Sequence, residues 1–138
     1  MRFWDASAIV PLCLEESLSS RALSLLQDDP EVVLWWASPV ECASAFARLR
    51  RDRVLDARQE GLALTRLRQL QENGFEIHPV ETIRDQAQRL LRVHPLRAGD
   101  ALQLAAAIEW SGSPVTGTFV SFDERLIAAA RLEGFDIQ

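Results

Sequence analysis

The chain of 138 residues contains no lysine, and all fifteen of its basic residues are arginine. This absence counts against receiver domains and aspartate-nucleophile phosphatases, because their sites normally need a lysine to bind the phosphoryl group. Arginine forms bidentate contacts with phosphate and stacks on bases, so the remaining cations would suit nucleic acid. Genomic base composition is the simpler explanation of the same bias. The net charge of −5 also argues against a partner held by charge alone.

Cysteine and long apolar runs are equally scarce. Cys13 and Cys42 stand alone in helical patterns without CxxC spacing, so we expect two small buried hydrophobic residues and neither a disulfide nor a zinc site. The longest apolar runs, VVLWWA at 32–37 and LAAAI at 104–108, are far shorter than the roughly 20 residues of a membrane span. Met1 leads directly into a strand pattern, with no signal peptide. We therefore expect a cytoplasmic protein without a membrane partner.

The length and the globular composition predict a single domain over residues 1–138, since neither a repeat nor a linker is visible. Short β-prone runs alternate with helical patterns, which indicates an α/β sandwich around a mainly parallel sheet. The expected strands are 2–5, 32–36, 75–78, 115–122 and 135–137. The expected helices are 6–16, 17–27, 38–52, 56–73, 82–93, 97–111 and 123–132.

Local signals mark several of these boundaries. The sequence Ser38-Pro39-Val40-Glu41 has the pattern of a capping box with proline in the first turn. Asn73-Gly74 is a typical helix end. The segment 111–117 is rich in glycine and serine, so the following strand could begin later than Val115.

Four acidic residues each lie at the end of an expected strand or in the first turn of an expected helix: Asp5, Glu41, Asp100 and Asp123. In a parallel sheet these positions share one edge of the domain, where α/β proteins bind ligands. Carboxylates gathered there raise each other's pKa unless a cation lies among them. Oxygen ligands suit Mg²⁺ or Mn²⁺, and such ions commonly serve in phosphodiester cleavage. The acids therefore predict a metal-dependent nuclease, whose bound cation would also reverse the negative local charge.

Each acid also has a purely structural explanation. Asp5 and Asp123 could be N-caps, Glu41 the reciprocal residue of the capping box, and Asp100 an acid favoured by the helix dipole. Singly these explanations are the stronger ones, but they do not explain why all four acids fall at one edge of the sheet.

Four blocks of the sequence resemble, in order, the signature blocks of PIN-domain ribonucleases, in particular the VapC-type toxins of toxin–antitoxin pairs. The blocks are FWDASAIVPL at 3–12, SPVECASAFARL at 38–49, LRAGDALQLAAA at 96–107 and FVSFDERL at 119–126. The resemblance spans nearly the whole chain. It implies a PIN-like three-layer α/β/α sandwich and a Mg²⁺-dependent endoribonuclease, with Mn²⁺ as an alternative ion, that leaves a 5′-phosphate and a 3′-hydroxyl.

The resemblance also implies roles for individual residues. Asp5, Glu41, Asp100 and Asp123 would be the catalytic and metal-binding quartet, with Asp100 or Glu41 as the general base. Ser7 and Ser121 would orient metal, water or carboxylates without binding the ion directly. The same resemblance implies a small antitoxin partner and a homodimer with two sites along one RNA groove. The helices at 17–27 and 38–49 could hold a segment of the antitoxin, or could equally be ordinary core.

Residues that grip the substrate are harder to assign from sequence. Arg48 lies about two turns from Glu41 on the same helix face and is a candidate RNA contact. Arg97 precedes Asp100 and could either contact the RNA phosphate or brace a carboxylate. The surrounding run RLRRDR at 48–53 could equally be a solvated face. We expect all four tryptophans in the core, with a dimer contact or base stacking as alternatives for Trp35, Trp36 and Trp110. Neither His78 nor His94 is expected to be catalytic.

Two other classes remain open. A phosphoacceptor or phosphatase domain is disfavoured by the lack of lysine and because Ser7, not a second aspartate, stands two residues after Asp5. A catalytically inactive PIN-like module that only binds a partner would be expected to have lost acids of the quartet, and all four are present.

Overall fold

A computed structural model describes all residues from Met1 to Gln138. Its centre is a five-stranded sheet with the order β3-β2-β1-β4-β5, and every neighbouring pair is parallel. The strands are β1 (Arg2–Trp4), β2 (Val32–Trp35), β3 (Phe75–Ile77), β4 (Thr118–Val120) and β5 (Asp136–Ile137). Strand β2 is an apolar run, and β1 is apolar after Arg2, because both faces of a parallel sheet are covered.

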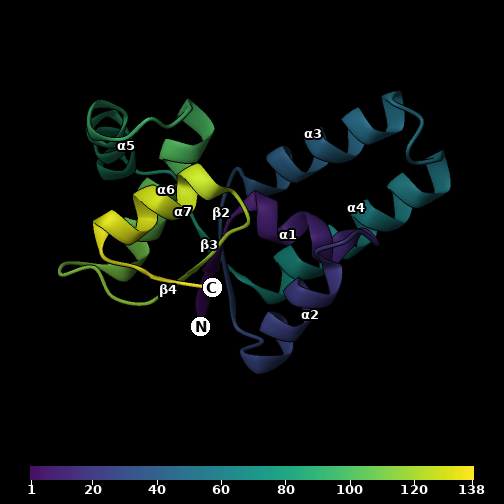
Figure 1. Cartoon of the computed structure of the whole chain (residues 1–138), viewed down its shortest axis with the longest axis horizontal. Helices are drawn as coiled ribbons and strands as arrows, with labels where there is room; N and C mark the ends of the chain where they lie inside the picture. Colours follow the sequence, from purple (N-terminus) through teal and green to yellow (C-terminus); the bar gives the residue numbers. More distant parts are fainter.

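Seven helices cover the two faces of this sheet. They are α1 (Ala6–Cys13), α2 (Ser19–Asp28), α3 (Ser38–Arg51), α4 (Ala57–Asn73), α5 (Glu81–Val93), α6 (Ala98–Ser111) and α7 (Glu124–Glu133). Figure 1 shows α1–α4 gathered on one side of the sheet and α5–α7 on the other. The expected three-layer α/β/α sandwich is confirmed.

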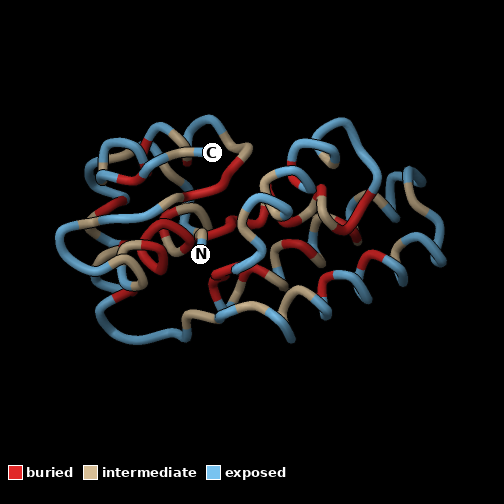
Figure 2. The backbone as a smooth tube through the Cα atoms, turned by 90° about the horizontal axis from the view of Figure 1, so that it is seen from below, coloured by how far each residue is buried: buried red, intermediate tan, exposed pale blue.

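Alternation along the strands divides the core into two clusters. Phe3 packs with α5–α7, whereas the next residue, Trp4, packs with α1–α4. Phe119 and Val120 divide in the same way on β4, because successive side chains of a strand point to opposite faces. Figure 2 shows the buried segments in the interior and exposed backbone around them. Cys13 and Cys42 are free and buried, as expected.

The tryptophans do not all lie in the core. Trp4 and Trp35 are buried, which confirms the prediction for these two. Trp110 is half-buried and its ring lies 6.2 Å from that of Phe3. The core prediction is wrong for Trp36, which is 51% exposed because it follows the last residue of β2, where the strand leaves the covered part of the sheet.

Several boundaries differ from the sequence expectations. Helix α1 ends at Cys13, not Glu16, and α2 begins at Ser19, not Ser17. The Ser19 hydroxyl donates to the Leu14 carbonyl and accepts from the Glu16 amide, which stabilises a turn between the two helices. Strand β4 begins at Thr118, which confirms the later start that the glycine-rich segment suggested.

The predicted capping box at Ser38 is wrong. The helix already includes Ser38, its N-cap is Ala37, and no side chain caps it. The Ser38 hydroxyl instead donates to Oε1 of Gln103, 65 residues away, at 3.0 Å. The hydroxyl that the local pattern assigned to capping the start of α3 therefore bonds a buried side chain on α6.

Gly74 ends α4, as expected, for a reason that the sequence does not reveal. Its φ of −92° is open to any residue, so the usual left-handed cap is absent. A Cβ at this position would lie 2.8 Å from the Leu70 carbonyl oxygen and 2.9 Å from Cδ2 of Leu34. Glycine is needed because α4 passes close to β2.

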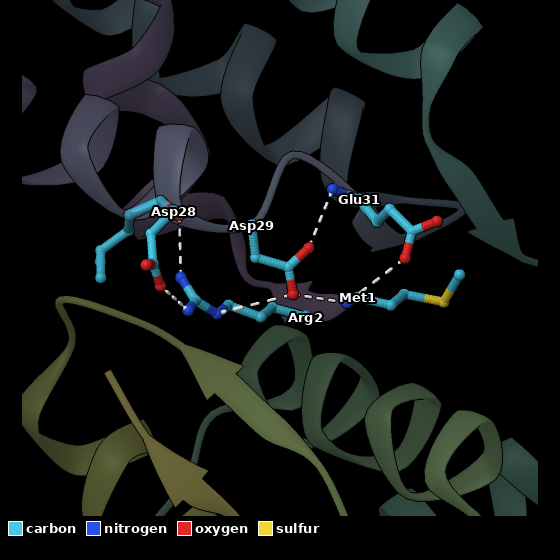
Figure 3. Close-up of polar contacts among 6 residues, drawn as sticks. Met1, Arg2, Asp28, Asp29 and Glu31 are labelled. Atoms are coloured by element: carbon cyan, nitrogen blue, oxygen red, sulfur yellow. Dashed lines mark hydrogen bonds and ion pairs between the residues drawn. The ribbon is translucent and has the colours of Figure 1, made fainter.

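A polar cluster at the start of β1 ties α2 to the sheet (Figure 3). Nη1 of Arg2 donates to the Leu25 carbonyl at 2.8 Å, and Nη2 contacts Asp28 near the end of α2. The N-terminal amine pairs with Asp29, and this hydrogen bond lowers the pKa of Asp29. The Arg2 side chain is only 13% exposed, so these contacts are partly shielded from solvent.

Arg2→Ala should lower the free energy of unfolding by about 1–2 kcal/mol, because hydrogen bonds to a charged donor are lost from a partly buried site. Urea unfolding would measure the change, with Arg92→Ala as the control, since Arg92 is exposed and has no ion pair. An Arg2 variant no less stable than the Arg92 variant would contradict this role.

None of the helices combines the length and the apolar composition that a membrane crossing requires.

Candidate active site

The four acids follow or begin elements at the carboxyl edge of the sheet. Asp5 directly follows β1 and is the N-cap of α1, and Asp123 is the N-cap of α7. Glu41 and Asp100 lie in the first turns of α3 and α6. Asp5 and Asp123 are therefore N-caps, as their structural explanation requires. Glu41 is not the reciprocal residue of a capping box, because α3 has no capping box.

Asp5 is the most deeply buried of the four, with 4% of its surface exposed. Its carboxylate accepts hydrogen bonds from the Ser7 hydroxyl at 2.7 Å and from the Ser7 amide at 3.1 Å. Burial raises the pKa of Asp5 to about 6, although hydrogen bonds from Ser7 and Ser121 oppose the shift and the charge of Glu41 adds to it. An ionised carboxylate at this position is thus costly in the metal-free protein.

Glu41 links Asp5 to Asp100. Burial raises the pKa of Glu41, the Gln103 side chain opposes the rise, and the charge of Asp100 adds to it. A Cβ on Gly99 would lie 3.7 Å from Oε1 of Glu41, so the carboxylate faces the first turn of α6 closely. This turn begins where Asp100 accepts a hydrogen bond from the backbone amide of Arg97 at 3.2 Å.

Two serines connect Asp5 to the strand that carries Asp123. The hydroxyls of Ser7 and Ser121 lie 3.3 Å apart. Ser7 accepts from the Phe122 amide at 2.8 Å, and Ser121 accepts from the Asp123 amide at 3.1 Å. The carboxylate of Asp123 in turn accepts from the amides of Arg125 and Leu126. The hydroxyls thus hold the β1–α1 and β4–α7 connections together.

The structure brings three acids into electrostatic contact: Asp5 with Glu41, and Glu41 with Asp100. Asp123 joins them only through the serine pair. No group of three or more histidine, cysteine, aspartate or glutamate side chains is spaced to hold a metal ion as it stands. None of the four acids belongs to an ion pair. Oxygen donors with uncompensated charge nevertheless have the chemistry that a hard divalent cation requires.

Gln103 is a site residue that the sequence did not single out. It lies one turn after Asp100 on α6 and is buried. Its Oε1 accepts from Ser38, while its Nε2 makes no hydrogen bond of normal geometry and contributes to lowering the pKa of Glu41. The only sequence signal was a glutamine within the apolar run of α6.

Gln103→Met should raise the pKa of Glu41 further. Methionine fills a similar volume but removes the amide that lowers the pKa of Glu41, so Glu41 would ionise later as the pH rises. Titration of the Glu41 carboxyl carbon followed by NMR would measure this change. Gln88→Met, on the exposed side of α5, is the matched control. An unchanged Glu41 pKa in the Gln103 variant would contradict the role of the Gln103 amide.

The two candidate substrate contacts have different surroundings. Arg48 lines a hollow of about 390 Å³ together with Ser7 and Glu41. The Arg97 side chain is exposed, and Arg97 contacts Asp100 only through its backbone amide. Residues 51–53 lie at the far end of the α3–α4 pair, away from the sheet (Figure 1).

Neither histidine is held beside the acids by a described contact. Nε2 of His94 bonds Oε1 of Glu133 at 2.7 Å, and the same carboxylate binds Arg89. Burial raises the pKa of Glu133, but the bonds from Arg89 and His94 outweigh it and the pKa is lowered overall. His78 is largely exposed, with Glu76 as its neighbour. The His94 contact ties the α5–α6 connection to α7.

The family model of the PIN domain matches residues 2–132. The chain belongs to the PIN-domain family. The signature blocks therefore identified the family correctly, and the match includes all four acids and both serines. No curated protein sequence matches this PIN domain significantly.

Solved structures share the fold at low sequence identity. VapC20 of Mycobacterium tuberculosis, described as a toxin that cleaves the sarcin–ricin loop, has a TM-score of 0.71 and 19% identity, covering 99% of this chain and 97% of its own. FitAcB of Neisseria gonorrhoeae has a TM-score of 0.68 and 17% identity, covering 99% and 96%. PAE2754 of Pyrobaculum aerophilum has a TM-score of 0.68 and 18% identity, covering 99% and 87%. At these identities the likeness establishes the fold alone.

Proposed function

We propose that this PIN-domain protein is a metal-dependent endoribonuclease. The observation that carries the proposal is Asp5, a buried carboxylate that lies beside Glu41 without a cationic partner. A buried carboxylate of this kind is costly to ionise unless a cation lies beside it, which favours a cation site at this position. Membership of the PIN family and the VapC20 likeness support the same conclusion.

In this proposal Asp5, Glu41 and Asp100 hold a Mg²⁺ or Mn²⁺ ion, and Asp123 approaches it directly or through water. The ion would polarise the scissile phosphate and lower the pKa of the attacking water. Glu41 and Asp100 are the candidates to accept the proton of that water, since both lie in first turns that face each other. Ser7 and Ser121 keep Asp5 and the β4–α7 connection in place. The products would carry a 5′-phosphate and a 3′-hydroxyl.

Cleavage of total RNA with Mg²⁺, Mn²⁺ or EDTA tests this function. The wild type should produce discrete fragments only with a divalent ion, and Asp100→Asn should produce none. Asp85→Asn makes the same chemical change on the exposed side of α5 and should cleave normally. Cleavage that persists equally in EDTA and in the Asp100 variant would disprove the metal–carboxylate mechanism. A wild type that cuts no RNA would instead favour the inactive partner-binding module.

We further propose that the protein is a toxin held inactive by a small antitoxin. A mostly apolar hollow of about 320 Å³ lies between α1, α2 and α4, lined by Leu12, Leu23, Leu26 and Leu70 among others. It would suit an apolar helix of the antitoxin. Of the two expected walls, 17–27 contributes to this hollow through α2, whereas 38–49 does not, because α4 forms the opposite wall. Co-expression with the protein encoded next to it should suppress cleavage, and Leu23→Asp should release that suppression.

The homodimer also stays a proposal. Exposed apolar side chains at Trp36, Val40 and Val80 are candidates for its interface. Light scattering of the purified protein would give its mass in solution. A monomeric mass at all concentrations would exclude the dimer.

A further inference from the structure

A third hollow, of about 360 Å³, is lined by Ser121 and Phe122, which lie between β4 and Asp123. The start of α2, one face of α7 and the end of β5 form it. Its lining includes Arg21, Ser121, Phe122, Glu124, Ile127 and Arg131. The hollow that contains Arg48 is lined by Ser7, and this one by Ser121, whose hydroxyls are 3.3 Å apart. The two depressions therefore flank the serine pair, so that an extended strand could pass from one to the other beside the acids.

Phe122 provides a fixed aromatic surface in this hollow. Its ring packs against the core beneath α1–α4, and its backbone amide donates to the Ser7 hydroxyl at 2.8 Å. Cζ of Arg21 lies over the ring, 5.5 Å from its centroid. This distance is within the range of a cation–π contact, which orients the guanidinium group.

Neither Arg21 nor Arg131 belongs to an ion pair within the protein. The arginines in ion pairs are Arg2, Arg50, Arg84 and Arg89. Arg21 and Arg131 are both exposed. Glu124 is the acidic side chain among the lining residues, so the side chains sum to one positive charge, and the carboxylate of Gln138, which also lines the hollow, offsets it.

We propose that Arg21, held on Phe122, is a platform on which a base of single-stranded RNA stacks next to the scissile phosphate. Arg131 would contact the phosphate of the same nucleotide. A guanidinium plane stacks on bases in the same way as an aromatic ring, and it does so only where the base is unpaired. The lack of a net charge in the hollow suits stacking better than a grip based on phosphate charge alone. This inference rests on the proposed function, because it takes RNA to be the substrate.

Binding in a cleavage-deficient background tests the platform separately from the chemistry. A fluorescein-labelled single-stranded RNA of about 12 nucleotides would be titrated against Asp100→Asn protein in EDTA, with fluorescence anisotropy as the readout. Adding Arg21→Ala should weaken binding roughly tenfold, as expected for loss of one stacked base. Arg21→Lys should weaken it similarly, because lysine retains the charge but loses the planar group. Arg92→Ala, which removes one exposed charge on α5, should have little effect.

Further outcomes decide the matter. Phe122→Leu should reproduce the Arg21 defect, and a duplex of the same sequence should not respond to Arg21→Ala. Wild-type binding by Arg21→Lys would show that only charge matters, and would overturn the platform. So would equal binding by the Arg21→Ala and Arg92→Ala variants, no RNA binding at all, or binding of acidic peptides in place of RNA. If Arg21-dependent RNA binding persists while the wild type cuts no RNA, the nuclease proposal fails, and the platform stands only as a stacking site for single-stranded RNA without a scissile phosphate.

Discussion

Asp5→Asn should abolish RNA cleavage and, at the same time, stabilise the metal-free protein at pH 8. Cleavage should fall at least about 100-fold, because even residues that only support a metal ligand cost 10–100-fold when they are replaced. Asparagine is as good an N-cap as aspartate, so α1 should keep its start. Its amide oxygen can accept from the Ser7 amide, and its nitrogen can donate to the Ser7 hydroxyl, which is free to donate to Ser121.

The pKa of Asp5 determines the sign of the stability change. Burial raises this pKa from 3.8 to about 6, so the folded protein binds the proton more tightly than the unfolded chain does. Stability from this group is present at low pH and is lost as the pH rises from about 4 to about 6, by an amount on the order of 3 kcal/mol. Asparagine stays neutral, so it avoids this loss. The variant should exceed the wild type in stability at pH 8 and match it near pH 4.

Urea unfolding in EDTA at both pH values, together with cleavage assays in Mg²⁺, would measure the two effects. Adding Mg²⁺ should stabilise the wild type but not the Asp5 variant, since only the wild type retains the complete site. Asp85→Asn should change neither property. A variant that cleaves at a tenth of the wild-type rate or more, or one that is less stable than the wild type at pH 8, would disprove the role assigned to Asp5.

Phe119→Ala should be the most destabilising of the changes considered, at about 3–5 kcal/mol. Phe119 is completely buried in β4. Its ring stacks on Phe3 with 5.5 Å between centroids and lies 5.6 Å from Phe135, so truncation removes contacts with β1 and with the segment before β5. For a chain of this length, the melting temperature should fall by roughly 10 °C or more.

Phe75→Ala is the matched control, because Phe75 lies in edge strand β3 and is 57% exposed. Thermal unfolding followed by circular dichroism would compare the two variants, and the control should lose less than about 1 kcal/mol. Phe119→Leu should fall between Phe119→Ala and the wild type. Similar losses at both phenylalanines would show that β4 is not central to the core. Because Ser121 and Asp123 directly follow β4, cleavage by Phe119→Ala should be assayed well below its melting temperature.

Much of the fold could be predicted because its signals are local. The apolar run of β2 and the helical spacing of 56–73 depend on neighbouring residues alone. The local reasons assigned to helix ends were less accurate where a distant contact competes with a local one. Ser38 illustrates this, since its hydroxyl bonds Gln103 on α6 and not the end of its own helix. Gly74 is a second case, where the crowding comes from Leu34 of β2 as well as from its own helix.

The candidate site also has features that the sequence predicted and features that it did not. The positions of Asp5, Glu41, Asp100 and Asp123 at strand ends and first turns could be inferred from the sequence, because the parallel alternation of strands and helices requires these ends to share one edge. The sequence did not indicate how different the surroundings of these four acids are. Asp5 is buried beside Glu41, whereas Asp123 joins the others only through Ser7 and Ser121.

By itself the sequence determined the class of fold, the family, and which carboxylates and serines stand at the ends of its elements. Each of these depends on periodicity, on caps or on the order of motifs along the chain. Only the tertiary structure decided that Gln103 faces Glu41, that Trp36 is exposed, and that Arg21 lies over Phe122 beside the serine pair. The two contacts among these join residues that are far apart in the sequence, such as Arg21 and Phe122. They arise when sheet order brings β1 beside β4 and the helices dock on the two faces, which no local pattern encodes.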